Sequence, residues 1–305
     1  MLLLVVDGHV SRCLVGALEP GWKSTHDEES TGMLQEFRGL TAVVSGAGSG
    51  IGLATAQRLT SLGAKVIGLD LRVGEMAGAA EWVSCDVGSS DSVQNAFREI
   101  GTRTDVIDIL VNNAGIGAIG GIEDATDEEW TSVLNVNVVG ISRVSKAALR
   151  FLRRSESASI VNTCSIAATL GLPKRAIYSA SKGAVESLTR AMAADLIHEN
   201  IRVNCVNPGT ADTPWVARLL DLASDPAAER FALEQRQPNG RLVTPDEVAR
   251  AICFLADPGQ RSTTGSVLAV DGGMNGVRVG NYVPPDLSVT SSESSFTSSR
   301  RRRES

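Results

Sequence analysis

Short runs of β-branched and apolar residues alternate with longer amphipathic runs along most of this chain, and no other feature limits the fold as much. Most short runs are apolar at consecutive positions, as strands are when helices cover both faces of a parallel sheet. The predicted strands are TAVVSG (41–46), AKVIGLD (64–70), EWVSCD (81–86), DILVNNAG (108–115), ASIVNTCS (158–165), IRVNCVNPG (201–209) and SVLAVDGG (266–273). This pattern predicts an α/β fold: one doubly wound domain with a seven-stranded parallel sheet and helices on both faces.

Helical patterns fill the intervals between the predicted strands. The sequence predicts helices over residues 50–62, 127–154 and 179–198, the last because apolar residues recur there at helical spacing. A further helix is predicted to begin at TPDE (244–247), which supplies an N-cap, a first-turn proline and a capping-box acid, and to end near Leu255.

The two ends of the chain lack this alternation. Residues 1–36 are predicted to be an N-terminal extension, either loose or read from a start codon placed too far upstream. The opening MLLLVV lacks the basic segment of a signal peptide and is soon interrupted by charges. Residues 278–305 are rich in Ser and then in Arg, cannot bury a core, and are predicted to be a disordered tail. The ordered domain is expected to span residues 37–277.

Composition and charge exclude several classes of protein. Hydrophobic residues make up 43% of the 305 residues, enough for a sizeable core, and the net charge of −6 argues against nucleic acid as a partner. No apolar run approaches the ~18 residues of a membrane span. The five cysteines are scattered, without a CxxC pair or a His cluster, so we expect reduced thiols, a cytoplasmic protein and no metal site.

A glycine-rich turn follows the first predicted strand, in VVSGAGSGIGLATAQRL. Gly46, Gly50 and Gly52 stand where side chains would keep the backbone from a pyrophosphate at the helix N-terminus. Asp70 ends the second predicted strand, where a carboxylate binds the adenosine ribose and repels a 2′-phosphate. This context predicts a dinucleotide site that prefers NAD to NADP, although Arg72 is a nearby feature that favours NADP.

Tyr178 and Lys182 lie four positions apart in RAIYSASKGAV and so share a helical face. Alone, such a pair favours only a surface contact. Beside a dinucleotide site, however, the ammonium can stabilise the phenolate and make the tyrosine a proton-transfer group.

Together and in this order, these motifs resemble the short-chain dehydrogenase/reductase family over residues of roughly 37–275. Its NNAG motif is intact at 112–115 and its PG motif follows at 208–209. The resemblance implies a Rossmann domain, hydride transfer between NAD or, less favoured, NADP and a small secondary alcohol or its ketone, and a homotetramer.

The resemblance also implies roles for particular residues. In the family's catalytic set, Asn137 holds a water linked to Lys182, Ser165 binds the substrate oxygen, Tyr178 moves the proton, and Lys182 also reaches the nicotinamide ribose. The expected cofactor-binding residues are Gly46, Ser49, Gly50, Ile51, Gly52, Asp70, Asp86, Val87, Asn113, Ala114, Gly115, Tyr178, Lys182, Pro208, Gly209, Ala211, Asp212 and Thr213.

The segment from PGTADTPW to VTPDEVA resembles one subgroup, the cytosolic type-2 3-hydroxybutyrate dehydrogenase-like proteins and related sugar-acid dehydrogenases. These bind a substrate carboxylate with arginines. Arg175 and Arg236 match two of the positions, whereas Arg218 lies one residue from the third. Ser165, Arg175, Tyr178 and Arg236 are therefore the expected substrate-binding residues, and a hydroxy acid or sugar acid is the expected substrate, since a guanidinium fork suits a carboxylate.

Two alternatives stay open. One is an NADPH-dependent 3-oxoacyl-carrier-protein-type reductase, which Asp70 disfavours. The other is a catalytically inactive NAD-binding regulatory protein, which the intact catalytic set disfavours.

Overall fold

The computed structural model describes residues 36–280. They contain one sheet of seven parallel strands in the order β3-β2-β1-β4-β5-β6-β7. The strands are β1 (Thr41–Ser45), β2 (Lys65–Asp70), β3 (Glu81–Ser84), β4 (Ile109–Asn112), β5 (Ser159–Thr163), β6 (Arg202–Pro208) and β7 (Val267–Val270). All seven predicted strands are present, so the predicted fold is confirmed.

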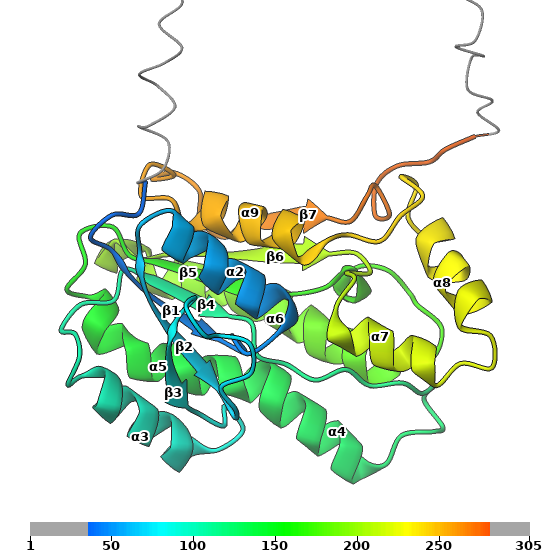
Figure 1. The fold of residues 1–305 in the computed structure, drawn as a ribbon, viewed down its shortest axis with the longest axis horizontal. Helices are drawn as coiled ribbons and strands as arrows, with labels where there is room; N and C mark the ends of the chain where they lie inside the picture. The colour runs from blue at the N-terminus through cyan, green and yellow to red at the C-terminus, as the bar shows by residue number, and fades with distance from the viewer. Residues whose placement is uncertain (1–35, 281–305) are drawn as a thin grey trace, which may run out of the picture.

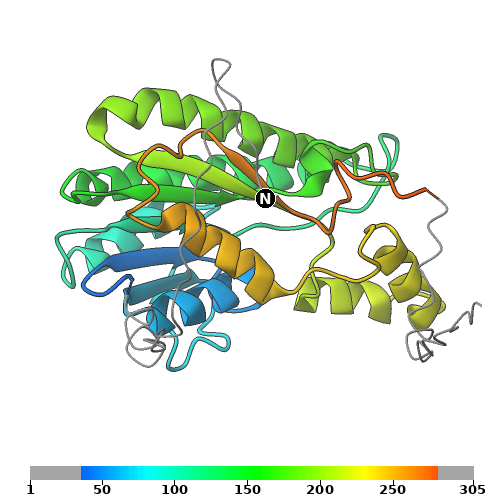
Figure 2. The same ribbon diagram turned by 90° about the horizontal axis from the view of Figure 1, so that it is seen from above.

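Helices cover both faces of this sheet (Figures 1 and 2). Helices α2 (Gly50–Ser61) and α9 (Pro245–Ala256) lie side by side on one face. Helices α3 (Ser90–Ile100), α5 (Gly140–Leu152) and α6 (Ala176–Leu196) pack on the other, and α4 (Asp127–Leu134) lies against α6. Two hydrophobic cores follow from this layering.

Strand β1 explains why the strand runs are apolar at consecutive positions. Val43 packs into the core beneath α3 and α5, whereas Ala42 and Val44 pack into the core beneath α2 and α9. Successive side chains of a strand point to opposite faces, so a strand buried on both faces needs an apolar residue at every position.

The predicted helix over 127–154 contains an interruption. Between α4 and α5 the chain forms a π-helical turn, η2 (Asn135–Val139). Such turns occur often at functional sites, and this one carries Asn137. The hydrophobic pattern continues through the turn, so the sequence predicts one unbroken helix.

Helices α7 (Pro214–Asp221) and α8 (Pro226–Gln235) lie beyond the carboxyl ends of the strands, apart from the two helical layers (Figure 2). They share a small core of Val216, Leu220, Leu233 and Leu242. Neither these two helices nor α3 is among the predicted helices. We refer to α7 and α8 together as the lid.

The predicted extension and tail lie outside the described residues, apart from residue 36 and residues 278–280, and stay predictions. The first strand of the described residues begins at Thr41 and the last ends at Val270. No helix within residues 36–280 is long and apolar enough to cross a membrane.

Candidate active site

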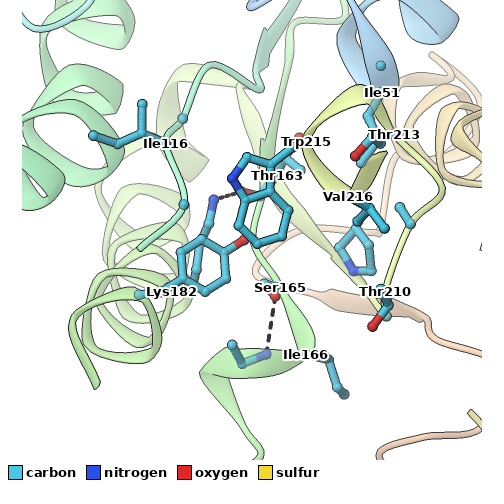
Figure 3. Close-up of a pocket in the computed structure, with 18 of the residues that line it drawn as sticks. Ile51, Ile116, Thr163, Ser165, Ile166, Lys182, Thr210, Thr213, Trp215 and Val216 are labelled. Carbon is cyan, nitrogen blue, oxygen red and sulfur yellow. Dashed lines mark hydrogen bonds between the residues drawn. The ribbon is translucent and has the colours of Figure 1, made fainter. Parts of the chain in front are cut away.

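A cavity of about 350 Å³ opens at the carboxyl ends of the strands (Figure 3). Most of the predicted site residues meet in its wall: Gly46, Ser49, Gly50, Ile51, Asp70, Asn113, Ala114, Gly115, Ser165, Arg175, Tyr178, Lys182, Pro208, Gly209, Ala211, Thr213 and Arg236. Parallel strands end at one edge of a sheet, so segments far apart in the chain come together there.

Five predicted site residues lie outside this wall: Gly52, Asp86, Val87, Asn137 and Asp212. The Asp86 carboxylate accepts a hydrogen bond from the Gly88 N–H (2.8 Å). The Asp212 carboxylate is turned toward the lid and pairs with Arg230 (2.8 Å). The cofactor contacts of Asp86, Val87 and Asp212 therefore stay predictions.

The glycine-rich turn leaves an open helix N-terminus at the cavity. Gly46 and Gly50 have φ of +67° and +55°, a region that residues with a Cβ rarely adopt. Ser49, the N-cap of α2, makes no side-chain hydrogen bond to the helix, and the first turn carries no acidic residue. The backbone N–H groups there are free to bind an anion, such as a pyrophosphate.

Asp70 ends β2 beside this turn. Its carboxylate accepts hydrogen bonds from the Gly48 N–H (3.0 Å) and the Arg72 N–H (3.4 Å). The Trp82 indole donates to the Asp70 backbone carbonyl (3.2 Å). The carboxylate is therefore fixed against the turn, the position predicted for binding a ribose.

Tyr178 and Lys182 lie one turn apart on α6, with the Lys182 Nζ 5.7 Å from the centre of the Tyr178 ring. Lys182 is 6% exposed and donates to the Thr163 backbone carbonyl (2.9 Å; Figure 3). The Ser165 Oγ accepts the Ala167 N–H (3.2 Å). Because that oxygen acts as an acceptor, the hydroxyl proton of Ser165 is free to be donated to a ligand.

Asn137 is buried behind the cavity. Its Oδ1 accepts the Ile116 N–H (2.8 Å), and its Nδ2 donates to the Ile116 carbonyl (2.9 Å) and the Ser181 Oγ (3.1 Å). These bonds tie the π-helical turn to the loop after β4 and to α6. The predicted water between Asn137 and Lys182 stays a prediction.

Three arginines line the lid side of the cavity. Arg175 precedes α6, donates to the Ala118 carbonyl (3.0 Å) and lies 5.2 Å from the Trp215 ring centre. Burial lowers the pKa of Arg175, as does the nearby charge of Arg236, whereas Tyr178 raises it. An arginine nevertheless stays protonated in proteins. Arg236, which matches a predicted position, and Arg218, which lies one residue from one, also line the cavity and are exposed.

A family model described as enoyl-(acyl carrier protein) reductase matches residues 46–275. A cis-4-hydroxycyclohexanecarboxylate dehydrogenase of Sinomonas cyclohexanicum is 39% identical over 255 residues, which cover 80% of this chain and all of that protein. The chain belongs to the short-chain dehydrogenase/reductase family.

Two further relatives differ in the reactions for which they are named. A 3-oxoacyl-[acyl-carrier-protein] reductase of Vibrio harveyi is 35% identical over 245 residues, covering 78% of this chain and 98% of that protein. The ligand-free structure of aldohexose dehydrogenase from Thermoplasma acidophilum matches with a TM-score of 0.76 at 35% identity, covering 83% of this chain and all of that one. Short-chain dehydrogenases/reductases are oxidoreductases that use a nicotinamide cofactor, and the open helix N-terminus and the fixed Asp70 carboxylate fit one.

The apolar part of the cavity wall was not predicted from the sequence. Ile116, Leu172, Trp215, Val216, Leu219 and Leu233 line it. Four of them belong to the lid, whose helices have only eight and ten residues, too few for a long periodic run of apolar positions. Each lid helix has a start signal that could have placed it: Pro214 after Thr213 for α7, and Pro226 after the N-cap Asp225 for α8.

Proposed function

We propose that this chain is an NAD-dependent dehydrogenase that interconverts a secondary alcohol and a ketone on a small molecule bearing a carboxylate. The charge of the cavity carries this proposal. Its described wall holds four cationic side chains, Arg175, Lys182, Arg218 and Arg236, and a single acid, Asp70. Asp70 is fixed at the glycine-rich turn, so the rest of the wall is positive and suits a carboxylate.

The reacting groups have distinct roles in this proposal. The bound nicotinamide accepts or supplies the hydride. Tyr178 takes the alcohol proton at its phenol oxygen during oxidation and returns it during reduction. Lys182, held by the Thr163 carbonyl, stabilises the phenolate by its charge. Ser165 donates a hydrogen bond from its hydroxyl to the substrate oxygen and so orients that oxygen toward Tyr178.

Arg175 and Arg236 would bind the substrate carboxylate while the apolar wall holds its carbon skeleton. The Sinomonas relative is named for a compact cyclic hydroxy acid, which combines these two features. A homotetramer in the cytoplasm remains the predicted assembly and location.

A paired substrate screen tests the proposal. With NAD present and NADH absorbance followed, cis-4-hydroxycyclohexanecarboxylate and 3-hydroxybutyrate should each exceed their methyl esters by about tenfold or more in kcat/KM, as one charge-assisted contact predicts. Esters that match the acids would contradict a carboxylate site. A 3-oxoacyl thioester reduced faster with NADPH than any acid is oxidised would favour the acyl-carrier-protein alternative.

Asp70→Ala should lower the preference for NAD over NADP by about tenfold or more, because the repelling carboxylate and its ribose hydrogen bonds are lost together. The ratio of NADH to NADPH dissociation constants, measured by fluorescence titration, reports this without a substrate. Asp91→Ala, at an exposed acid on α3, is the control and should leave the ratio unchanged. A wild type that binds NADPH more tightly would overturn the assignment of Asp70.

Arg236→Gln should raise KM for the acids by about ten- to a hundredfold and leave KM for the esters unchanged, because one charged hydrogen bond is lost. Steady-state kinetics on the paired substrates separate the two effects. Arg250→Gln on α9, another exposed arginine, should change neither KM. An equal rise for acids and esters would show that Arg236 supports the lid rather than the carboxylate.

A further inference from the structure

Trp215 projects into the cavity from the first turn of α7 (Figure 3). Its ring lies against the backbone of Gly117, where an added Cβ would come within 2.4 Å of the ring. A second neighbour is the Arg175 guanidinium, 5.2 Å from the ring centre. The loop after β4, the start of α6 and the lid therefore meet at one side chain.

The first two of these segments are already joined by hydrogen bonds. Arg175 donates to the Ala118 carbonyl (3.0 Å). The Gly120 N–H donates to the Lys174 carbonyl (3.0 Å), and the Ala176 N–H donates to the Gly120 carbonyl (3.3 Å). The lid, by contrast, packs around its own core of Val216, Leu220, Leu233 and Leu242, with Trp215 at its margin. The Trp215 contact thus connects the lid to the loop after β4 and the start of α6, which are held together by their own hydrogen bonds.

Because the cavity is small, the position of the Trp215 ring affects how much space a substrate has. About 350 Å³ lies at the lower end of ligand-pocket volumes, roughly 300–1,000 Å³. The same cavity reaches from the glycine-rich turn to Arg175, so cofactor and substrate share it. An indole resting on Gly117 therefore leaves little room for bulk beside Arg175.

We propose that Trp215 is the specificity-determining residue of this site. Seated on Gly117, it limits the bulk of the substituent that a substrate can carry next to its reacting carbon while Arg175 holds the carboxylate. The choice of acids as probes rests on the proposed function, whereas the contact between Trp215 and Gly117 does not.

Two 3-hydroxy acids that differ only in the substituent on the reacting carbon provide the probe, and comparing their ratio between variants cancels the electronic difference between the substituents. 3-Hydroxybutyrate carries a methyl group where 3-hydroxy-3-phenylpropionate carries a phenyl ring. The wild type should favour the methyl acid, and Trp215→Ala should shift the ratio of kcat/KM toward the phenyl acid by at least tenfold. Trp215→Phe should shift it less. An equal loss for both acids in Trp215→Ala would overturn the proposal, because a side chain that only supports the lid predicts that result.

Gly117→Ala tests the contact independently of size. The new methyl would displace the indole, so this substitution should change the ratio in the wild-type background and leave it unchanged in the Trp215→Ala background. Gly121→Ala is the matched control, since its Cβ would meet only the Asp124 carboxylate at 3.4 Å. Equal effects of Gly117→Ala in both backgrounds would overturn the proposal.

A measurement without turnover separates failure of this inference from failure of the proposed function. Acrylamide should quench the fluorescence attributable to Trp215, found by difference from Trp215→Phe, more strongly in Gly117→Ala than in Gly121→Ala. If no acid is turned over, the proposed function fails and the quenching result alone decides the contact. Equal quenching in Gly117→Ala and Gly121→Ala would show that the ring does not rest on Gly117, and the proposal would then be wrong. Thermal melting of each variant checks that it is folded.

Discussion

Tyr178→Phe should lower kcat by about 10²–10⁴-fold, the usual contribution of a positioned acid–base group, while NADH binding stays within about twofold of wild type. The substitution deletes one oxygen and keeps the ring. Tyr178 is half-buried, and the Lys182 Nζ lies 5.7 Å from the ring centre, so the contacts of the ring on the lysine side remain. Single-turnover absorbance and fluorescence titration measure the two quantities separately. A variant that retains most of its rate would remove Tyr178 from the proton path.

Lys182→Ala should differ from Tyr178→Phe in a way that separates their roles. Because the lysine is proposed both to stabilise the phenolate and to hold the nicotinamide ribose, turnover and NADH affinity should fall together. It also leaves the buried Thr163 carbonyl without its donor, so thermal melting must accompany the kinetics. A folded variant with only one of the two losses would show that Lys182 has a single role.

The parts of this molecule that sequence predicts best are those with a local cause. Val43 and its neighbours in β1 are apolar on both faces because two helical layers cover them. Gly46 and Gly50 of the turn stand out because their backbone angles exclude most other residues. Each of these requirements acts on a few consecutive residues, so the pattern is visible in the chain itself.

The parts that sequence missed depend on contacts between distant segments. The π-helical turn accompanies the hydrogen bonds of Asn137 to Ile116, 21 residues away. The Asp212 carboxylate pairs with Arg230 on the lid, 18 residues further on, a contact that no motif in the sequence predicts. Trp215 reads as an ordinary helical residue until Gly117 is seen beneath its ring. No periodicity or motif reports such pairings.

Gly52→Ala should lower the melting temperature by roughly 4 °C or more and weaken NADH binding by about tenfold or more. Helix propensity alone predicts the opposite sign, because alanine is favoured over glycine inside a helix by about 0.5–1 kcal/mol. Packing outweighs that gain here. An added Cβ would stand 2.0 Å from the Gly46 carbonyl oxygen and 2.5 Å from the Asn113 Nδ2.

Neither the Gly46 carbonyl nor the Asn113 side chain can move away without breaking hydrogen bonds. Asn113 Nδ2 donates to the Ser45 and Gly46 carbonyls, both at 3.2 Å, and so holds the glycine-rich turn against β4. Overpacking typically costs about 1–3 kcal/mol, and a Cβ this close to a backbone oxygen should cost about 3 kcal/mol, the upper end of that range. About 2–4 °C is lost per kcal/mol in a domain of this size. Moving the turn away from α2 also alters the N–H groups that would bind the pyrophosphate, which is why affinity should fall with stability.

Gly183→Ala is the matched control for Gly52→Ala, since it is the same substitution within a helix. There the added Cβ would meet only the Ala168 carbonyl, at 4.0 Å. Because no close contact opposes the substitution there, the higher helix propensity of alanine should decide the result, and the melting temperature should rise slightly. Differential scanning calorimetry of both variants compares the two signs directly. If the melting temperature of Gly52→Ala also rose, the glycine-rich turn would be able to move at little cost in stability. Close packing would then not explain why glycine stands at position 52.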